Sequence, residues 1–89
     1  MRIIRLSGRE ASVVRAIGFS DSALGSQIQD MTRMQLEDAT EVVNSLLAAG
    51  FVESIPYAEE VTLAEFSVTS FGINPAYSHQ LRSAIQNRV

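Results

Sequence analysis

The most constraining feature of the sequence is an apolar stripe that repeats at helical spacing and then stops at a glycine. Its members are Leu36, Ala39, Val43, Leu46 and Leu47, with Val42 at its edge. Residues three and four apart lie on one side of an α-helix, and a glycine commonly ends one. The spacing therefore predicts a helix over residues 35–49 that ends at Gly50 and faces a core.

The opposite side of this predicted helix is acidic. Glu37, Asp38 and Glu41 fall within an arc of about 100°, accompanied by Asn44 and Ser45. Carboxylates on a helix face are most often solvated. We therefore expect these side chains to point outward, away from the core.

A first helix is predicted near the amino terminus. Ser7 and Glu10 have the spacing of a capping box, and Gly18 follows an apolar face. Together these signals predict a helix over residues 7–17. Residues 2–6 hold Ile3, Ile4 and Leu6 between arginines, which is typical of a short edge strand or a lead-in arm.

A short second helix is predicted just before the long one. Ser26 and Gln29 repeat the capping-box spacing, which predicts a helix over residues 26–32 with Ser26 as its cap. Ile28 and Met31 are expected on its buried side. Because few residues separate it from the long helix, the two must turn sharply, as in a helix-turn-helix.

Strands are expected on either side of this helix pair. Beyond the long helix, β-branched and aromatic residues predict a β-hairpin over residues 51–69, interrupted at Pro56. Phe66 and Val68 would share one face of its returning strand. A brief strand is also expected at residues 23–24.

A last helix is predicted over residues 75–87, because Asn74 is a good N-cap and Pro75 a good first helical residue. Its apolar side admits two interpretations. It covers the core of its own chain, or it pairs with the same helix of a second copy in a homodimer. The residues concerned are Tyr77, Leu81 and Ile85.

Composition restricts size and compartment. The chain has 89 residues and no cysteine, so we expect one domain without disulfides or cysteine-based zinc sites. No apolar run approaches the roughly 18 residues of a membrane helix, and no secretory signal stands at the start. These features favour a cytoplasmic protein that does not enter a membrane.

Few residues could carry catalysis. The single histidine, His79, has no metal-binding or catalytic motif around it, and no serine stands in a nucleophile elbow. The acidic residues lack the turn glycine and alternating oxygens of a calcium loop. We therefore expect a protein that is not an enzyme and that uses no metal or other cofactor.

The order of helix, helix-turn-helix and two-stranded hairpin resembles the winged helix-turn-helix superfamily. The most recognisable part is Leu46-Leu47-Ala48-Ala49-Gly50-Phe51-Val52-Glu53, where the long helix leads into the wing. The resemblance covers roughly residues 7–70. It implies an α+β, mainly α fold of three helices and a β-wing of two or three strands, with an additional C-terminal helix. Winged helices read DNA, dock proteins or form dimers, so the fold leaves the function open.

The resemblance also implies which surfaces would face DNA, namely the first turns of the long helix and the tip of the hairpin. The helix positions hold Gln35, Glu37, Asp38 and Glu41, and the tip holds Tyr57, Ala58, Glu59 and Glu60. Phosphates repel carboxylates, and no basic residue escorts these acids in the sequence. Both surfaces are therefore poorly suited to DNA.

Two functions remain. The first is a regulatory interaction module that binds a basic protein partner and also has the potential to self-associate; its partner-binding residues would be Glu37, Asp38, Glu41, Glu59 and Glu60. The alternative is a dimeric DNA-binding transcriptional regulator. Its contacts would come from Arg33, Gln35, Arg2, Arg5 and Arg9. Net charge is −3, but residues 1–36 carry five arginines against three acids, so the alternative has a basic region to use.

Overall fold

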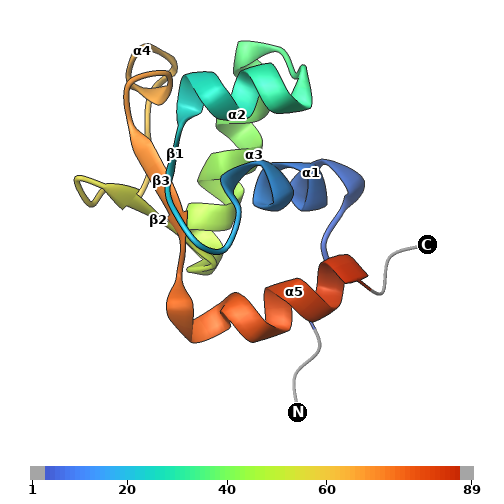
Figure 1. Ribbon diagram of the computed structural model, residues 1–89. Coiled ribbons are helices and arrows are strands. Elements are labelled where there is room, and N and C mark those ends of the chain that lie inside the picture. Colours follow the sequence, from blue (N-terminus) through green and yellow to red (C-terminus); the bar gives the residue numbers. More distant parts are fainter. Residues whose placement is uncertain (1–3, 87–89) are drawn as a thin grey trace.

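The computed structural model describes residues 4–86, which form an α+β, mainly α structure with helices in 58% of those residues (Figure 1). The elements are α1 (Gly8–Ile17), β1 (Ala23–Leu24), α2 (Gly25–Thr32), α3 (Leu36–Ala49), β2 (Val52–Ile55), α4 (Leu63–Phe66), β3 (Ser70–Ile73), the 3-10 helix η1 (Pro75–Tyr77) and α5 (Ser78–Gln86). The predicted α+β, mainly α class is confirmed.

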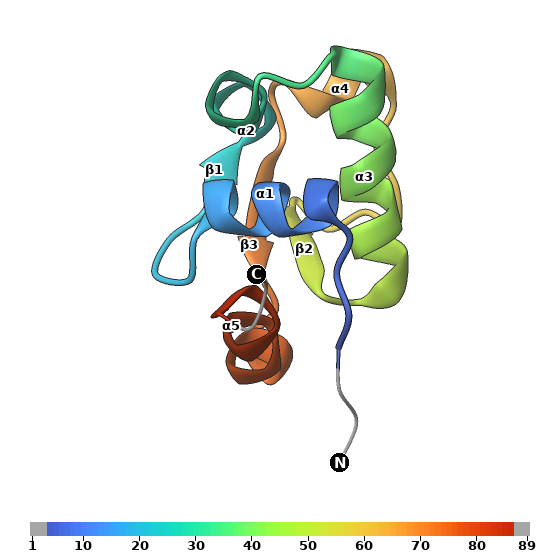
Figure 2. The ribbon, with the colours of Figure 1, turned by 90° about the vertical axis from the view of Figure 1, so that its right-hand side faces the viewer.

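The three strands form a small antiparallel sheet in the order β1-β3-β2. The central strand is β3, because Phe71 lies opposite Ala23 on one side and opposite Ser54 on the other. The two views show α2 and α5 at opposite ends of the molecule, with α1 between them and α3 running along one side (Figures 1 and 2). This arrangement encloses one core.

Every layer contributes to that core. The largest fully buried side chains are Phe66, Phe71, Ile28, Leu46, Leu81, Val13, Val14 and Val43. Removing one such side chain from water contributes about 1.5–3 kcal/mol to folding. The predicted core residue Leu46 is confirmed in its place on the inner side of α3.

Two helices follow the sequence signals closely. At the start of α1, the Ser7 hydroxyl accepts from the Glu10 N–H (3.2 Å), and the Ser7 N–H donates to Glu10 Oε1 (2.8 Å). This capping box confirms the predicted helix start. At the end of α3, Gly50 adopts a left-handed φ of +83°, which a side-chain-bearing residue rarely adopts. The brief strand at residues 23–24 is also confirmed.

The start of α2 differs from the prediction. Ser26 is not its N-cap, since the helix begins at Gly25 and Leu24 is the capping residue. The N–H groups of Gly25 and Ser26 donate to the carbonyl oxygens of Thr69 and Ser67, at 3.0 and 3.2 Å. Because a distant segment of backbone satisfies these first donors, the helix needs no serine cap.

The burial within α2 was predicted only in part. Ile28 is fully buried as expected, but Met31 is 66% exposed. The helix ends at Arg33, which adopts a left-handed conformation (φ 60°) and donates its N–H to the Gln29 carbonyl at 2.8 Å. This tight end produces the predicted sharp turn into α3.

The predicted hairpin over residues 51–69 is wrong in its second half. The strand β2 starts at Val52, near the predicted place, but its partner is β3 at Ser70–Ile73. The segment expected to return as a strand contains α4 instead. The two strands are antiparallel neighbours, as in the predicted hairpin. The segment that connects them is longer than predicted and contains a helix.

A capping box explains why α4 forms. The Thr62 hydroxyl accepts from the Glu65 N–H (3.2 Å), and the Thr62 N–H donates to Glu65 Oε1 (3.0 Å). That backbone hydrogen bond lowers the pKa of the Glu65 carboxyl. Phe66 is then buried while Val68 is 77% exposed, so the two do not share a strand face.

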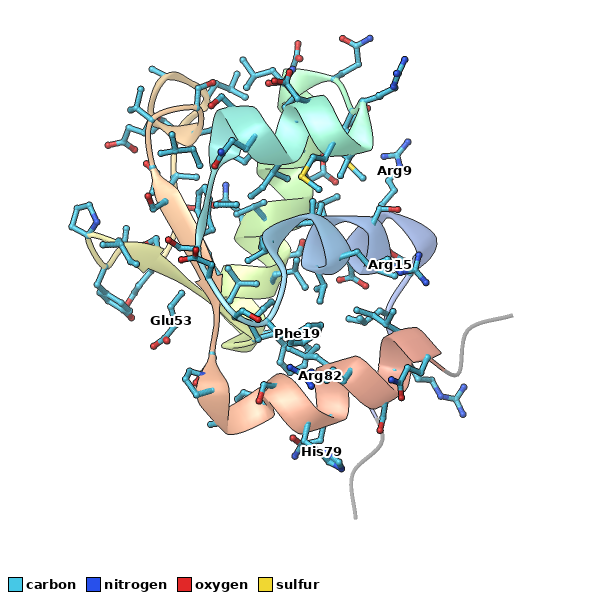
Figure 3. The ribbon with its side chains drawn as sticks, in the orientation of Figure 1. Arg9, Arg15, Phe19, Glu53, His79 and Arg82 are labelled. Atoms are coloured by element: carbon cyan, nitrogen blue, oxygen red, sulfur yellow. The ribbon has the colours of Figure 1, made fainter. Side chains whose placement is uncertain are left out.

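The chain ends also need correction. Residues 4–7 form no strand, and residues 2 and 3 lie outside the described residues. The predicted last helix divides into η1 and α5, with residue 87 outside the described range. Asn74 caps η1 as predicted, and Arg82 of α5 lies over the ring of Phe19, 4.9 Å from its centroid (Figure 3).

Candidate partner-binding surface

The two sides of α3 differ completely in exposure. Ala39, Val43 and Leu46 are fully buried, whereas Glu37 and Glu41 are exposed. Ser45 and Ala48 continue the exposed side toward the end of the helix. At 100° per residue these outward positions form one stripe along α3. The structure therefore places both glutamates outward, as predicted.

The loop at residues 56–62, which connects β2 to α4, is held beside α3 by Asn44. The Asn44 amide donates to the Val61 carbonyl (2.9 Å), and its Oδ1 accepts from the Val61 N–H (2.8 Å). Asn44 was expected on the solvated face, but it is half-buried. Its side-chain amide pairs with both backbone groups of Val61, as a neighbouring strand would. Glu60, which precedes Val61, and Glu41, one turn before Asn44, are both exposed.

Ser54 fixes the beginning of the same loop. Its buried hydroxyl accepts from the Ala58 N–H (2.7 Å) and donates to the Pro56 carbonyl (2.9 Å). Tyr57, between the two bonded residues Pro56 and Ala58, is exposed, and so is Glu59, which follows Ala58. The loop therefore presents its polar side chains outward from an anchored backbone.

An open groove of about 540 Å³ lies where this loop, β2 and the end of α3 meet. Its charged lining is Glu53, Glu59 and Glu60, and its apolar lining includes Ala48 from the exposed stripe. Glu53 projects from β2 (Figure 3). The carbonyl end of α3, which carries partial negative charge, adds to the groove.

The stripe and the groove together form one surface, called the acidic face here and below. Its carboxylates are Glu37, Glu41, Glu53, Glu59 and Glu60. Among residues 4–86, no three or more ionisable ligands are arranged to hold a metal ion. The carboxylates are instead spread along α3 and the loop, a distribution that suits an extended partner.

The remaining predicted acid, Asp38, lies at the edge of this surface and has a basic neighbour. Arg9 Nη1 on α1 lies 3.8 Å from Asp38 Oδ1, with the two side chains 66% and 43% exposed. Such an exposed pair contributes about 0–1 kcal/mol. The expectation that the acids of α3 have no basic escort is therefore wrong at this position. It failed because the packing of α1 beside α3 is a tertiary feature.

The residues of the DNA-binding alternative come from the segment before α1, from α1 itself and from the turn between α2 and α3. Arg33 and Gln35 are exposed in the turn between α2 and α3, and Arg5 is exposed ahead of α1. Arg9 approaches the first turn of α3 through its ion pair. Arg2 lies outside the described residues.

The apolar side of α5 covers the core of its own chain. Leu81 is fully buried, and the Tyr77 ring packs edge-on against Phe51 with centroids 5.1 Å apart. Ile85 is half-buried, and His79 points away from the body (Figure 3). Leu81 therefore covers the core of its own chain and is not exposed to contact a second copy.

No helix within residues 4–86 has the length and apolar character needed to cross a membrane. Comparisons with protein-family models, curated proteins and solved structures give no match to this chain.

Proposed function

We propose that this chain is a non-catalytic, winged-helix regulatory module that binds a basic protein partner through its acidic face. The observation that carries the proposal is the continuity of that face. The exposed stripe of α3 passes through Ala48 into a groove lined by three further glutamates. Five exposed carboxylates thus lie on α3, on β2 and on an anchored loop.

The order of elements supports the winged-helix part of the proposal. Helix, helix-turn-helix and two neighbouring antiparallel strands follow one another as the superfamily resemblance implies. The short β1 adds a third strand beside β3. In this chain the wing also contains α4, which packs against α3 and departs from a simple hairpin.

Electrostatics supports the basic partner. Exposed carboxylates attract guanidinium and ammonium groups and repel phosphates, and several acids on one surface add their fields. Within residues 4–86, the ion pair of an acid on α3 joins Asp38 to Arg9 of α1, at the edge of the face. Among these residues no ion pair engages the five glutamates of the acidic face, which would bind a partner's cations.

The test is binding of an oligoarginine peptide, followed by fluorescence anisotropy at low salt. The variant replaces all five glutamates of the acidic face with glutamine. Each exposed pair contributes about 0.3 kcal/mol, so the variant should bind about tenfold more weakly. The control variant, Asp21→Asn with Asp30→Asn, neutralises exposed acids elsewhere and should bind as the parent does. Equal affinity of parent and acidic-face variant would contradict the proposal.

Two observations favour the DNA-binding alternative: Arg9 approaches the first turn of α3, and Arg33 is exposed in the turn that precedes this helix. A mobility-shift experiment with random duplex DNA at low ionic strength separates the two functions. The proposal predicts no retardation, because the acidic face repels the phosphate backbone. Tight retardation that is lost in the variant Arg9→Gln with Arg33→Gln would reverse the ranking.

A further inference from the structure

A second groove, of about 270 Å³, lies between α1 and the end of α2. It is lined by Ser12, Arg15, Ala16, Met31 and Thr32. Met31 is the exposed apolar residue of this lining, with 66% of its surface open to water. Methionine is flexible and polarisable, so it adapts to the surface that covers it. This α1–α2 groove therefore offers a contact point that the core does not use.

The surroundings of the α1–α2 groove are basic. Arg15 lines it, Arg9 stands one helical turn before Ser12 on α1, and Arg33 directly follows Thr32. All three arginines are exposed, and Arg9 and Arg15 project from α1 (Figure 3). The nearest acid on α2, Asp30, is turned about 100° away from Met31 on the helix. The groove thus combines an apolar centre with cationic edges.

We propose that the α1–α2 groove receives the acidic face of a second copy of this chain, so that copies associate head to tail. This inference rests on the proposed function, because the acidic face is the surface that docks. Glutamates of one copy would meet Arg15 and Arg33 of the next, with Arg9, which also pairs with Asp38 of its own chain, beside them. The apolar residues of the acidic face, Ala48 and Tyr57, would contact Met31.

Charge complementarity within one chain is the argument for a second copy. The acidic face uses α3, β2 and the loop at residues 56–62, whereas the groove uses α1 and α2, and Figure 2 shows α1 in front with α3 to its side. A contact between two different surfaces leaves one of each kind free in every dimer. Such association continues into longer assemblies unless the geometry closes a ring.

The net charge does not prevent this contact. At −3 for the whole chain, overall repulsion between copies is small compared with the local attraction between oppositely charged surfaces. Salt screens the attraction between exposed charges over a Debye length, which is about 8–10 Å at ordinary salt, so charges farther apart than this interact little. Association should therefore weaken steeply as salt is added.

The test is sedimentation equilibrium of the full chain, from about 10 µM to about 1 mM protein, at about 0.02 M and about 0.3 M salt. At low salt the average mass should rise with concentration past that of a dimer. At high salt it should return toward one chain. A mass that stays at one chain throughout, or that does not respond to salt, would overturn the inference.

Two double variants, which replace charged or apolar side chains by uncharged polar ones, locate the contact. The groove variant carries Arg15→Ser and Met31→Ser, and the face variant carries Glu37→Gln and Glu41→Gln. Each alone should lose association, whereas an equimolar mixture should form a 1:1 dimer and nothing larger, because one intact surface of each kind remains. Asp30→Asn, an exposed change on α2 outside the groove, should associate as the parent does.

The outcomes also separate this inference from the proposed function. If the groove variant associates as well as the parent, the inference fails. If no variant or parent associates but the parent still binds oligoarginine through its acidic face, the inference fails and the proposed function stands. If the face variant associates normally and also binds oligoarginine normally, both fail. Circular dichroism melts of both variants exclude loss of fold as the cause, since every substituted side chain is exposed.

Discussion

The inner and outer sides of α3 divide stability from recognition on one helix. On the inner side, Ala39, Val43 and Leu46 are fully buried, and each has lost its contact with water to the core. On the outer side, Glu37 and Glu41 contact solvent. Burial of an apolar side chain contributes about 1.5–3 kcal/mol to the free energy of folding, whereas an exposed ion pair contributes about 0–1 kcal/mol.

The comparison teaches that substitutions on the two sides should be separable by measurement. Inner-side changes should alter the free energy of unfolding and affect binding only through folding. Outer-side changes should alter binding and leave the free energy of unfolding nearly unchanged. The following predictions test this division, in order of expected effect.

The largest effect is expected for Leu46→Ala on the inner side. Removing a fully buried leucine side chain leaves a cavity and should lower the free energy of unfolding by about 2–5 kcal/mol. In a domain of this size that loss is a large part of total stability. Urea unfolding followed by circular dichroism measures it. A loss below about 0.5 kcal/mol would mean that the helix faces are assigned wrongly.

The next effect is expected for Gly25→Ala at the junction of α2 and α4. A Cβ at Gly25 would collide with the backbone carbonyl of Phe66, which cannot rotate away as a side chain can. The free energy of unfolding should fall by about 1–3 kcal/mol. Thermal melting measures the change, with Gly72→Ala as the matched control because a Cβ there meets only ordinary contacts. Equal melting of both variants would contradict the close approach of α4 to α2.

An effect of similar size is expected for Asn44→Ala, because Asn44 lies between the two sides of α3 and is half-buried. It removes both hydrogen bonds to the backbone of Val61 and should cost about 1–3 kcal/mol. Hydrogen exchange of the Val61 amide should also accelerate, because its acceptor is lost. The control is Ser45→Ala, an exposed neighbour that should change neither quantity. Unchanged exchange at Val61 would show that Asn44 does not hold the loop.

The smallest effect on stability is expected for Glu41→Gln on the outer side. The side chain is exposed, so the free energy of unfolding should change by less than about 0.5 kcal/mol. A urea titration beside that of Leu46→Ala gives the direct comparison. A destabilisation of about 2 kcal/mol or more would place Glu41 in a structural role and end the division between the two sides.

Sequence patterns predicted the helices well where local signals and tertiary packing agree. The capping box at Ser7 and Glu10 and the glycine after α3 act within a few residues, so they are visible in the sequence. The same capping-box spacing at Thr62 and Glu65 indicates the start of α4. There, the β-branched and aromatic residues around it suggested a strand instead.

Other features depend on contacts between distant segments and leave no local signal. The backbone carbonyls of Ser67 and Thr69, after α4, accept from the first donors of α2, so the expected cap at Ser26 is unnecessary. The pairing of Asn44 with Val61 joins residues 17 positions apart. The outward direction of Glu37 and Glu41 followed from helical periodicity alone, but the groove that continues their surface appeared only in the structure.

The most direct test of the central claim is an NMR titration of the isotope-labelled chain with oligoarginine peptide. If the acidic face is the docking surface, amide shifts should concentrate at Glu37, Glu41, Glu53, Glu59 and Glu60, while the buried side of α3 changes little. Shifts confined to Arg33 and the start of α1 on addition of duplex DNA, with none at the acidic face on addition of peptide, would contradict it.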